Sequence, residues 1–168
     1  MKGRVLVTEA IEAGGMALLR DCGYEVVMGS GNDEMSVLRD IRGCDGVLTR
    51  NAAVTERAMR ASDRLKVISM HGVGVDLIDV EAATRLGIQV VNALGSNAQS
   101  VAEFTIGLIV ALSRNIVRYD RGLRGGDWSV RRALGEDLEG KTLGVVGMGA
   151  IGSLVAKKAV AGLDMRVL

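Results

Sequence analysis

Short apolar runs alternate with segments of helical periodicity along the first part of the chain. The apolar runs have the length of buried strands, and the segments between them place apolar residues three and four positions apart. The runs predict strands over residues 5–8, 25–28, 46–49, 65–69 and 88–92. The segments predict helices over residues 11–20, 33–41, 55–61 and 79–86, with Asp33, Thr55 and Asp79 as caps of the last three. This alternation is typical of a parallel sheet with helices on its faces, so we expect a doubly wound α/β domain over residues 1–97.

A long apolar helix follows this domain. Residues 100–117 carry apolar side chains on nearly every side, and Ser100 with Glu103 forms a capping-box pattern at the start. A helix that is apolar all round is buried from several sides, so we expect this one to cross between two domains. Residues 118–139 are polar, rich in glycine and arginine, and contain Trp128. We therefore assign residues 98–140 to a crossover helix and an arm.

A second strand–helix–strand pattern fills residues 141–168, with strands predicted over 142–146 and 165–168 and a helix over 151–161. The first strand leads into Gly147-Met-Gly149-Ala-Ile-Gly152, a G-x-G-x-x-G turn. Such glycines allow a tight turn, a close approach to pyrophosphate and close helix–strand packing, so the turn predicts a dinucleotide site. A purely structural glycine turn is the alternative. The carboxylate that binds the ribose is expected about 20 residues after the turn, a position outside residues 141–168. We therefore expect these residues to be a truncated start of an NAD-binding Rossmann domain.

Composition argues against several other classes of protein. Lys and Arg number 21 against 20 Asp and Glu, without a basic block interleaved with aromatic residues, which argues against nucleic acid as the main partner. The longest apolar stretch, residues 104–112, is shorter than the roughly 18 residues that span a bilayer, and the N-terminus lacks a signal-peptide pattern. Cys22 and Cys44 fit neither a disulfide framework nor a metal site. We expect a cytoplasmic protein without metal or membrane partner.

Five ordered stretches carry a resemblance to a known family. They read LKVISMHGVGVDLID (65–79), EAATRLGI (81–88), VNALGSN (91–97), SVAEFTIGLI (100–109) and LEGKTLGVVG (138–147). The chain resembles the D-isomer-specific 2-hydroxyacid dehydrogenases, closest to the phosphoglycerate dehydrogenases. The resemblance implies a flavodoxin-like substrate domain, a crossover helix, and the first βαβ unit of a Rossmann domain. It also implies NAD as the cofactor, with NADP still open, and a 2-hydroxy or 2-oxo acid as the substrate.

The resemblance also implies the roles of individual residues. Backbone amides of Gly72, Val73 and Gly74 would hold the substrate carboxylate, and Val73 would also approach the nicotinamide. Arg50 would contact the anionic end of the substrate, although a solvated charge at a strand end is the alternative, and His71 would lie in the loop near the substrate. The pyrophosphate would meet the turn residues Gly147, Gly149, Ala150, Ile151 and Gly152. The chain departs from the family pattern at Leu77 and at Leu94.

No residue matches the arginine, glutamate and histidine that the family uses for hydride transfer. His71 is the single histidine, but it lies in the substrate loop, so we assign no catalytic residue. We expect a truncated form that is inactive alone and binds NAD weakly. The alternative is a non-catalytic or engineered half-protein that serves as a folding or assembly module. Because the apolar helix and the Trp128 arm need a partner surface, we expect a homodimer.

Overall fold

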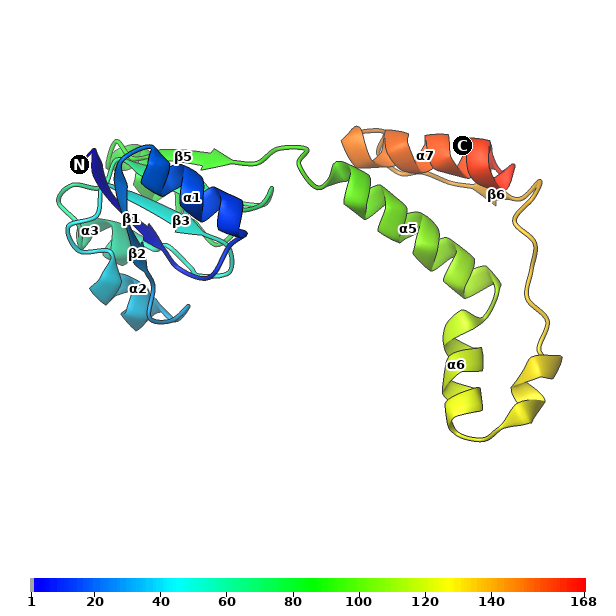
Figure 1. The fold of residues 1–168 in the computed structure, drawn as a ribbon. Coiled ribbons are helices and arrows are strands. Elements are labelled where there is room, and N and C mark those ends of the chain that lie inside the picture. The colour runs from blue at the N-terminus through cyan, green and yellow to red at the C-terminus, as the bar shows by residue number, and fades with distance from the viewer. Residues whose placement is uncertain (1) are drawn as a thin grey trace. The chain divides into compact units, whose positions relative to one another are not determined.

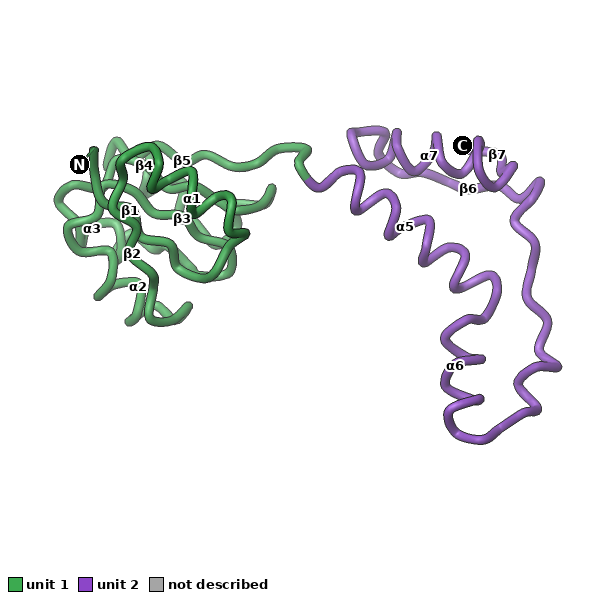
Figure 2. Tube along the Cα trace, in the orientation of Figure 1, with its two compact units in different colours: residues 1–96 green, residues 97–168 purple. Residues whose placement is uncertain are grey.

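The computed structural model describes residues 2–168. The chain divides into two compact units, residues 1–96 and residues 97–168, which Figure 2 shows in green and purple. Figure 1 labels most of their helices and strands.

The first unit is built on one parallel sheet of five strands. The strands are β1 (Gly3–Val7), β2 (Tyr24–Met28), β3 (Gly46–Thr49), β4 (Val67–Met70) and β5 (Gln89–Asn92). Their order in the sheet is β2-β1-β3-β4-β5, and every neighbouring pair is parallel. This is the strand order of flavodoxin-like folds. The predicted doubly wound α/β fold is therefore confirmed.

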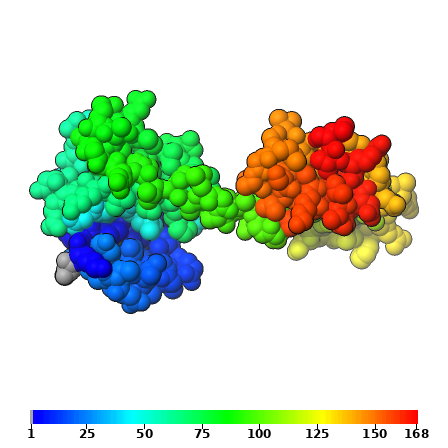
Figure 3. Space-filling view, turned by 90° about the horizontal axis from the view of Figure 1, so that it is seen from above, coloured from blue at the N-terminus to red at the C-terminus, as the bar shows by residue number. Residues whose placement is uncertain are grey.

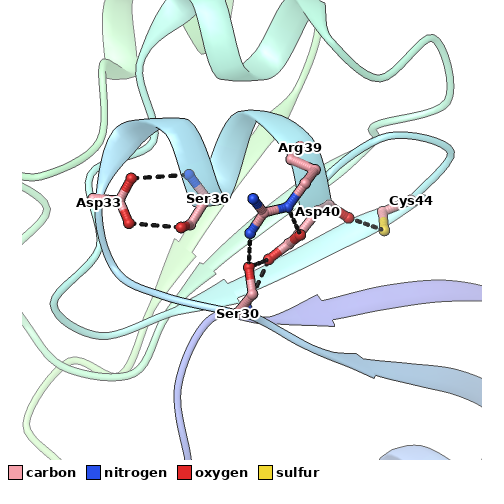
Figure 4. A network of polar contacts seen from close by, with 6 residues as sticks. All are labelled: Ser30, Asp33, Ser36, Arg39, Asp40 and Cys44. Carbon is pink, nitrogen blue, oxygen red and sulfur yellow. Dashed lines mark hydrogen bonds and ion pairs between the residues drawn. The ribbon is translucent and has the colours of Figure 1, made fainter.

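Four short helices connect these strands: α1 (Ala13–Asp21), α2 (Glu34–Asp40), α3 (Glu56–Arg60) and α4 (Val80–Arg85). The three predicted caps are confirmed, because the side chains of Asp33, Thr55 and Asp79 each accept a hydrogen bond from the first turn of the helix that follows. Figure 4 shows this contact for α2, where Asp33 accepts from the amide and the hydroxyl of Ser36 at 3.0 and 2.6 Å. At the other end of α2, Asp40 accepts from the Ser30 amide at 2.7 Å and so fixes the loop after β2.

The core of this unit lies on one face of the sheet. Right-handed crossovers place α2, α3 and α4 on one face and α1 on the other, because the chain reverses its direction across the sheet after β2. Leu6, Ile41 and Ile68 are completely buried and belong to one apolar cluster that the sheet forms with α2, α3 and α4. By contrast, α1 has no buried residue. Most of the apolar burial in this unit therefore comes from the α2–α4 side.

The second unit combines helices with one small βαβ element. Its elements are α5 (Ala98–Ser113), α6 (Ile116–Arg124), the 3-10 helix η1 (Trp128–Arg132), β6 (Thr142–Leu143), α7 (Ala150–Leu163) and β7 (Arg166–Val167). Strands β6 and β7 pair in parallel on either side of α7 in the sequence, as the pattern predicted, although both are shorter than expected. Helix α7 packs along α5 (Figure 1), and its surface is drawn in orange and red in Figure 3.

The predicted helix over residues 100–117 is wrong in three respects. The helix begins at Ala98, and the capping box does not form, because Glu103 accepts from the side chain of Gln99 at 2.6 Å instead of reaching back to the backbone. It ends at Ser113, and Asn115 takes a left-handed conformation (φ 55°), so α5 and α6 meet at a bend of 64°. It is also not buried all round, since Ala98 and Ala102 are its only buried residues.

The arm is more ordered than a plain connection. Residues expected as a polar link form α6 and η1, and the Tyr119 hydroxyl donates to the carbonyl of Ala133 across the arm. Gly122 makes the close approach possible, because a Cβ at this position would overlap the side chain of Val130.

A helix that crosses a bilayer must be both long and apolar. Among residues 2–168, no single helix is both long and apolar enough to cross a bilayer; α5 and α6 meet that test only when taken together across their 64° bend.

Candidate functional site

The glycine-rich turn between β6 and α7 exposes unpaired backbone donors. Helix α7 begins at Ala150, and its cap residue, Gly149, has no side chain that could accept a hydrogen bond from the first turn. The first backbone bond into the helix is from the Ser153 amide to the Gly149 carbonyl, at 3.0 Å. Within residues 2–168, the amides of Ala150, Ile151 and Gly152 have no protein acceptor. Free amides at the positive end of a helix dipole form an anion-binding site, which suits a pyrophosphate.

The fold of the chain requires glycine at two of the three glycine positions of the turn. Gly147 has a φ of 97°, a conformation that favours glycine. A Cβ on Gly152 would overlap the carbonyl oxygen of Gly147, so close packing of the helix on the turn requires glycine there. Gly149 has an ordinary φ of −73°, and a Cβ on it would meet no atom within 4 Å. The fold of the chain does not demand glycine at 149. The space beside it is open to a ligand, so the turn fits a dinucleotide pyrophosphate.

A second group of candidate residues lies at the carboxyl edge of the five-stranded sheet. The strand register pairs Thr49 with Met70, so the residues that follow them, Arg50 and His71, leave neighbouring strands side by side. The His71 amide donates to the Thr49 carbonyl at 2.7 Å, which extends this pairing into the loop. Both side chains are exposed. The structure thus brings Arg50 to the loop of residues 71–74, whereas the glycine turn belongs to the other unit.

The loop of residues 71–74 directs its carbonyl groups toward β5. The Gly72 carbonyl accepts from the Ala93 amide at 2.8 Å, and the Val73 carbonyl accepts from the Asn92 side chain at 2.6 Å. In the described chain, the amides of Gly72, Val73 and Gly74 have no protein acceptor. A carboxylate is an acceptor with several lone pairs, so this loop can bind one through its backbone. The sequence analysis missed Asn92, whose signal was a lone amide side chain at the end of a strand.

Glu9 and Asn51 form a further contact at this edge that the sequence analysis missed. The Glu9 carboxylate accepts from the Asn51 amide at 2.6 Å and from the Asn51 side chain at 2.7 Å. Partial burial by itself raises the pKa of Glu9, but the two hydrogen bonds from Asn51 and the nearby charge of Arg50 outweigh it. The pKa of Glu9 therefore lies below its ordinary value, and Glu9 is an anion at neutral pH.

Comparisons with known proteins identify the family. Residues 5–165 match the family model for the D-isomer specific 2-hydroxyacid dehydrogenase catalytic domain. The chain is 42% identical over 157 residues to a D-3-phosphoglycerate dehydrogenase of Methanocaldococcus jannaschii, covering 93% of this chain and 30% of the relative. It is 35% identical over 156 residues to the human D-3-phosphoglycerate dehydrogenase, covering 92% of this chain and 29% of the relative.

Solved structures agree with this assignment. The TT0316 protein from Thermus thermophilus matches with a TM-score of 0.88 at 36% identity, over 98% of this chain and 54% of the solved chain. The NAD+-bound 3-phosphoglycerate dehydrogenase of Entamoeba histolytica matches with a TM-score of 0.81 at 28% identity, over 99% of this chain and 53% of that one. The chain belongs to the D-isomer specific 2-hydroxyacid dehydrogenase family, a family of NAD-dependent enzymes. It spans about 30% of the length of the first-named relative.

Proposed function

We propose that this chain provides the substrate-acid site and the pyrophosphate turn of an NAD-dependent oxidoreductase acting on a 2-hydroxy acid. The open space beside Gly149 carries the proposal, because neither the conformation nor the packing of the chain requires glycine there. The relatives at 42% and 35% identity are D-3-phosphoglycerate dehydrogenases, so D-3-phosphoglycerate is the first substrate to test.

Each group of residues has a binding role in this proposal. The amides of residues 72–74 bind the substrate carboxylate, Arg50 attracts its anionic end, and His71 lies beside the substrate without moving a proton. Residues 147–152 hold the pyrophosphate through the amides of Ala150 and Ile151. A bound NAD would supply the hydride acceptor for the carbon that bears the hydroxyl. Residues 1–97 form the substrate domain, 98–140 the crossover and arm, and 141–168 the start of the coenzyme domain.

The 168 residues alone should bind NAD weakly and should not transfer hydride. The reason is that His71 is the single histidine and no residue matches the arginine, glutamate and histidine of the family. NMR titration with NAD should shift the amides of residues 150–152, while an assay with NADH and a panel of 2-oxo acids should show no turnover. Turnover that disappears in a His71→Ala variant would instead make His71 a catalytic residue. Absence of any shift at 150–152 would favour the assembly-module alternative.

The proposal also covers the class of partner, the cellular compartment and the cofactor. The charge balance of 21 basic to 20 acidic residues favours a small acid over nucleic acid as the partner. Cys22 and Cys44 are both free, which fits a reducing compartment, and we place the protein in the cytoplasm. NAD is the proposed cofactor, and parallel titrations with NAD and NADP distinguish the two.

We further propose that two copies form a homodimer through the second unit. Phe104, Leu112 and Trp128 of the second unit are 67%, 82% and 67% exposed, so each is a large apolar side chain that a partner copy could cover. Light scattering across a dilution series should show a dimer that dissociates, and Leu112→Lys should shift the midpoint to a higher concentration. Leu18→Lys is the matched control, since Leu18 is 64% exposed in the first unit. A compact monomer at every concentration would contradict the dimer.

A further inference from the structure

Two carboxylates link β1 to β3, one at each end of these strands. At the amino end, Asp45 accepts from the Arg4 amide at 2.9 Å and pairs with Arg64 at 3.0 Å. At the carboxyl end, Glu9 accepts from the Asn51 amide at 2.6 Å and from the Asn51 side chain at 2.7 Å. The two links use similar chemistry, but only the Glu9 link lies at the edge that carries Arg50.

The Glu9 link lies at the point where the strand order reverses. In the order β2-β1-β3-β4-β5, the chain turns back between β1 and β3. Open α/β sheets bind ligands in the crevice at the carboxyl ends of such strands. Here the Asn51 donors at this crevice are already bound by a carboxylate of the same chain. Glu9 therefore occupies these donors, whereas in the described chain the amides of residues 72–74 at the neighbouring edge have no protein acceptor.

The residues on either side of Arg50 are held firmly. Before it, Thr49 is fully buried, and its hydroxyl donates to the Ala52 carbonyl at 2.8 Å and accepts from the Thr8 hydroxyl at 3.3 Å. After it, Asn51 donates both its amide and its side chain to Glu9, and within residues 2–168 these donors have no other acceptor. Removing the Glu9 carboxylate would release the loop on one side of Arg50 and leave the Thr49 contacts in place.

We propose that Glu9 is a positioning residue that acts through Asn51 to fix Arg50 at the carboxyl edge of the sheet, beside the loop of residues 71–74. The proposal rests on the proposed function for the role of Arg50 in binding the substrate. The fixing of the loop itself can be measured without any ligand.

Glu9→Gln is the variant that tests this role, because it keeps the size of the side chain and turns one acceptor into a donor that faces the Asn51 side chain. A hydrogen bond to a charged group is worth more than a neutral one, so the Asn51 amide should exchange about tenfold faster or more. Binding of D-3-phosphoglycerate, followed by NMR shifts at His71 and Gly72, should weaken by about tenfold. Asp45→Asn is the matched control, because it breaks the other link between β1 and β3. It should leave both readouts unchanged.

Chemical rescue separates positioning from general loosening. In a Glu9→Ala variant, added acetate should restore slow exchange of the Asn51 amide and the affinity for D-3-phosphoglycerate, since acetate supplies the missing carboxylate; chloride at the same ionic strength should not. Unchanged exchange at Asn51 in Glu9→Gln, or equal weakening in Asp45→Asn, overturns the proposal. If the unaltered chain binds no D-3-phosphoglycerate, the substrate assignment fails, and the Asn51 exchange alone then decides whether Glu9 fixes the loop.

Discussion

An alanine at position 152 should abolish measurable NAD binding and destabilise the second unit. The added Cβ would overlap the carbonyl oxygen of Gly147, which is backbone, and Gly147 already has a φ of 97° that limits its movement. Overpacking of this kind typically costs about 1–3 kcal/mol. The turn must then open, which moves the amides of residues 150–152 away from one another. Thermal unfolding and NMR titration with NAD measure the two effects.

Gly162→Ala is the matched control for this substitution. Gly162 lies near the other end of α7, and a Cβ on it would meet no atom within 4 Å. Alanine is a better helix former than glycine by up to about 1 kcal/mol, so this variant should be as stable as the unaltered chain or slightly more stable. A Gly152→Ala protein that melts and binds NAD like the unaltered chain would show that the turn tolerates a side chain there.

Leu6→Ala should cause the largest loss of stability in the first unit. Leu6 lies on β1, an inner strand of the sheet, and is completely buried among the residues that pack against α2–α4. Truncation of a buried leucine costs about 2–5 kcal/mol, because it loses apolar contacts and leaves a cavity. Small domains are stable by about 5–15 kcal/mol, so this is a large share of the total.

Urea denaturation followed by circular dichroism measures this loss. Leu18→Ala provides the control, since Leu18 is 64% exposed on α1 and its truncation should change the free energy of unfolding by no more than about 0.5 kcal/mol. If the two variants unfold at the same urea concentration, the core does not lie where the structure puts it.

The sequence predicted best what short-range chemistry determines. The caps Asp33, Thr55 and Asp79 were identified from neighbouring residues, and each contact closes within one helical turn. The five strands were found because each is a short apolar run, and their alternation with helices indicated the doubly wound fold. The glycine turn was recognised for the same reason, since its three glycines lie within six residues.

The predictions that failed are those that depend on contacts between residues far apart in the sequence. The break after α5 is held by the Glu136 amide, which donates to the Ser113 carbonyl at 2.8 Å, and by the Asn115 side chain, which donates to the Leu134 carbonyl at 3.1 Å. The apolar periodicity of residues 100–117 does not depend on these contacts, so it predicted one continuous helix. Asn tolerates the left-handed conformation better than most residues, and this was the only local signal of a break.

The residues of the candidate site also divide into those that lie in short motifs and those whose partners are far away in the sequence. Residues 71–74 and 147–152 were found as motifs, whereas Glu9 was missed because its partner Asn51 is 42 positions away. Asn92 was missed for a similar reason, since it contacts Val73 from a strand 19 positions on. Their roles depend on the strand order, which brings the end of β1 beside that of β3 and the end of β4 beside that of β5.

One titration tests most directly whether a dinucleotide pyrophosphate lies against the backbone at Gly149. NAD is added to the unaltered chain, to Gly149→Ala and to Gly162→Ala, and the amide shifts of residues 150–152 are followed by NMR. Because a Cβ on Gly149 would meet no atom of the chain within 4 Å, Gly149→Ala should melt like the unaltered chain. It should bind NAD weaker by about tenfold or more, while Gly162→Ala binds normally. Equal NAD affinity in all three proteins would contradict a pyrophosphate site at Gly149.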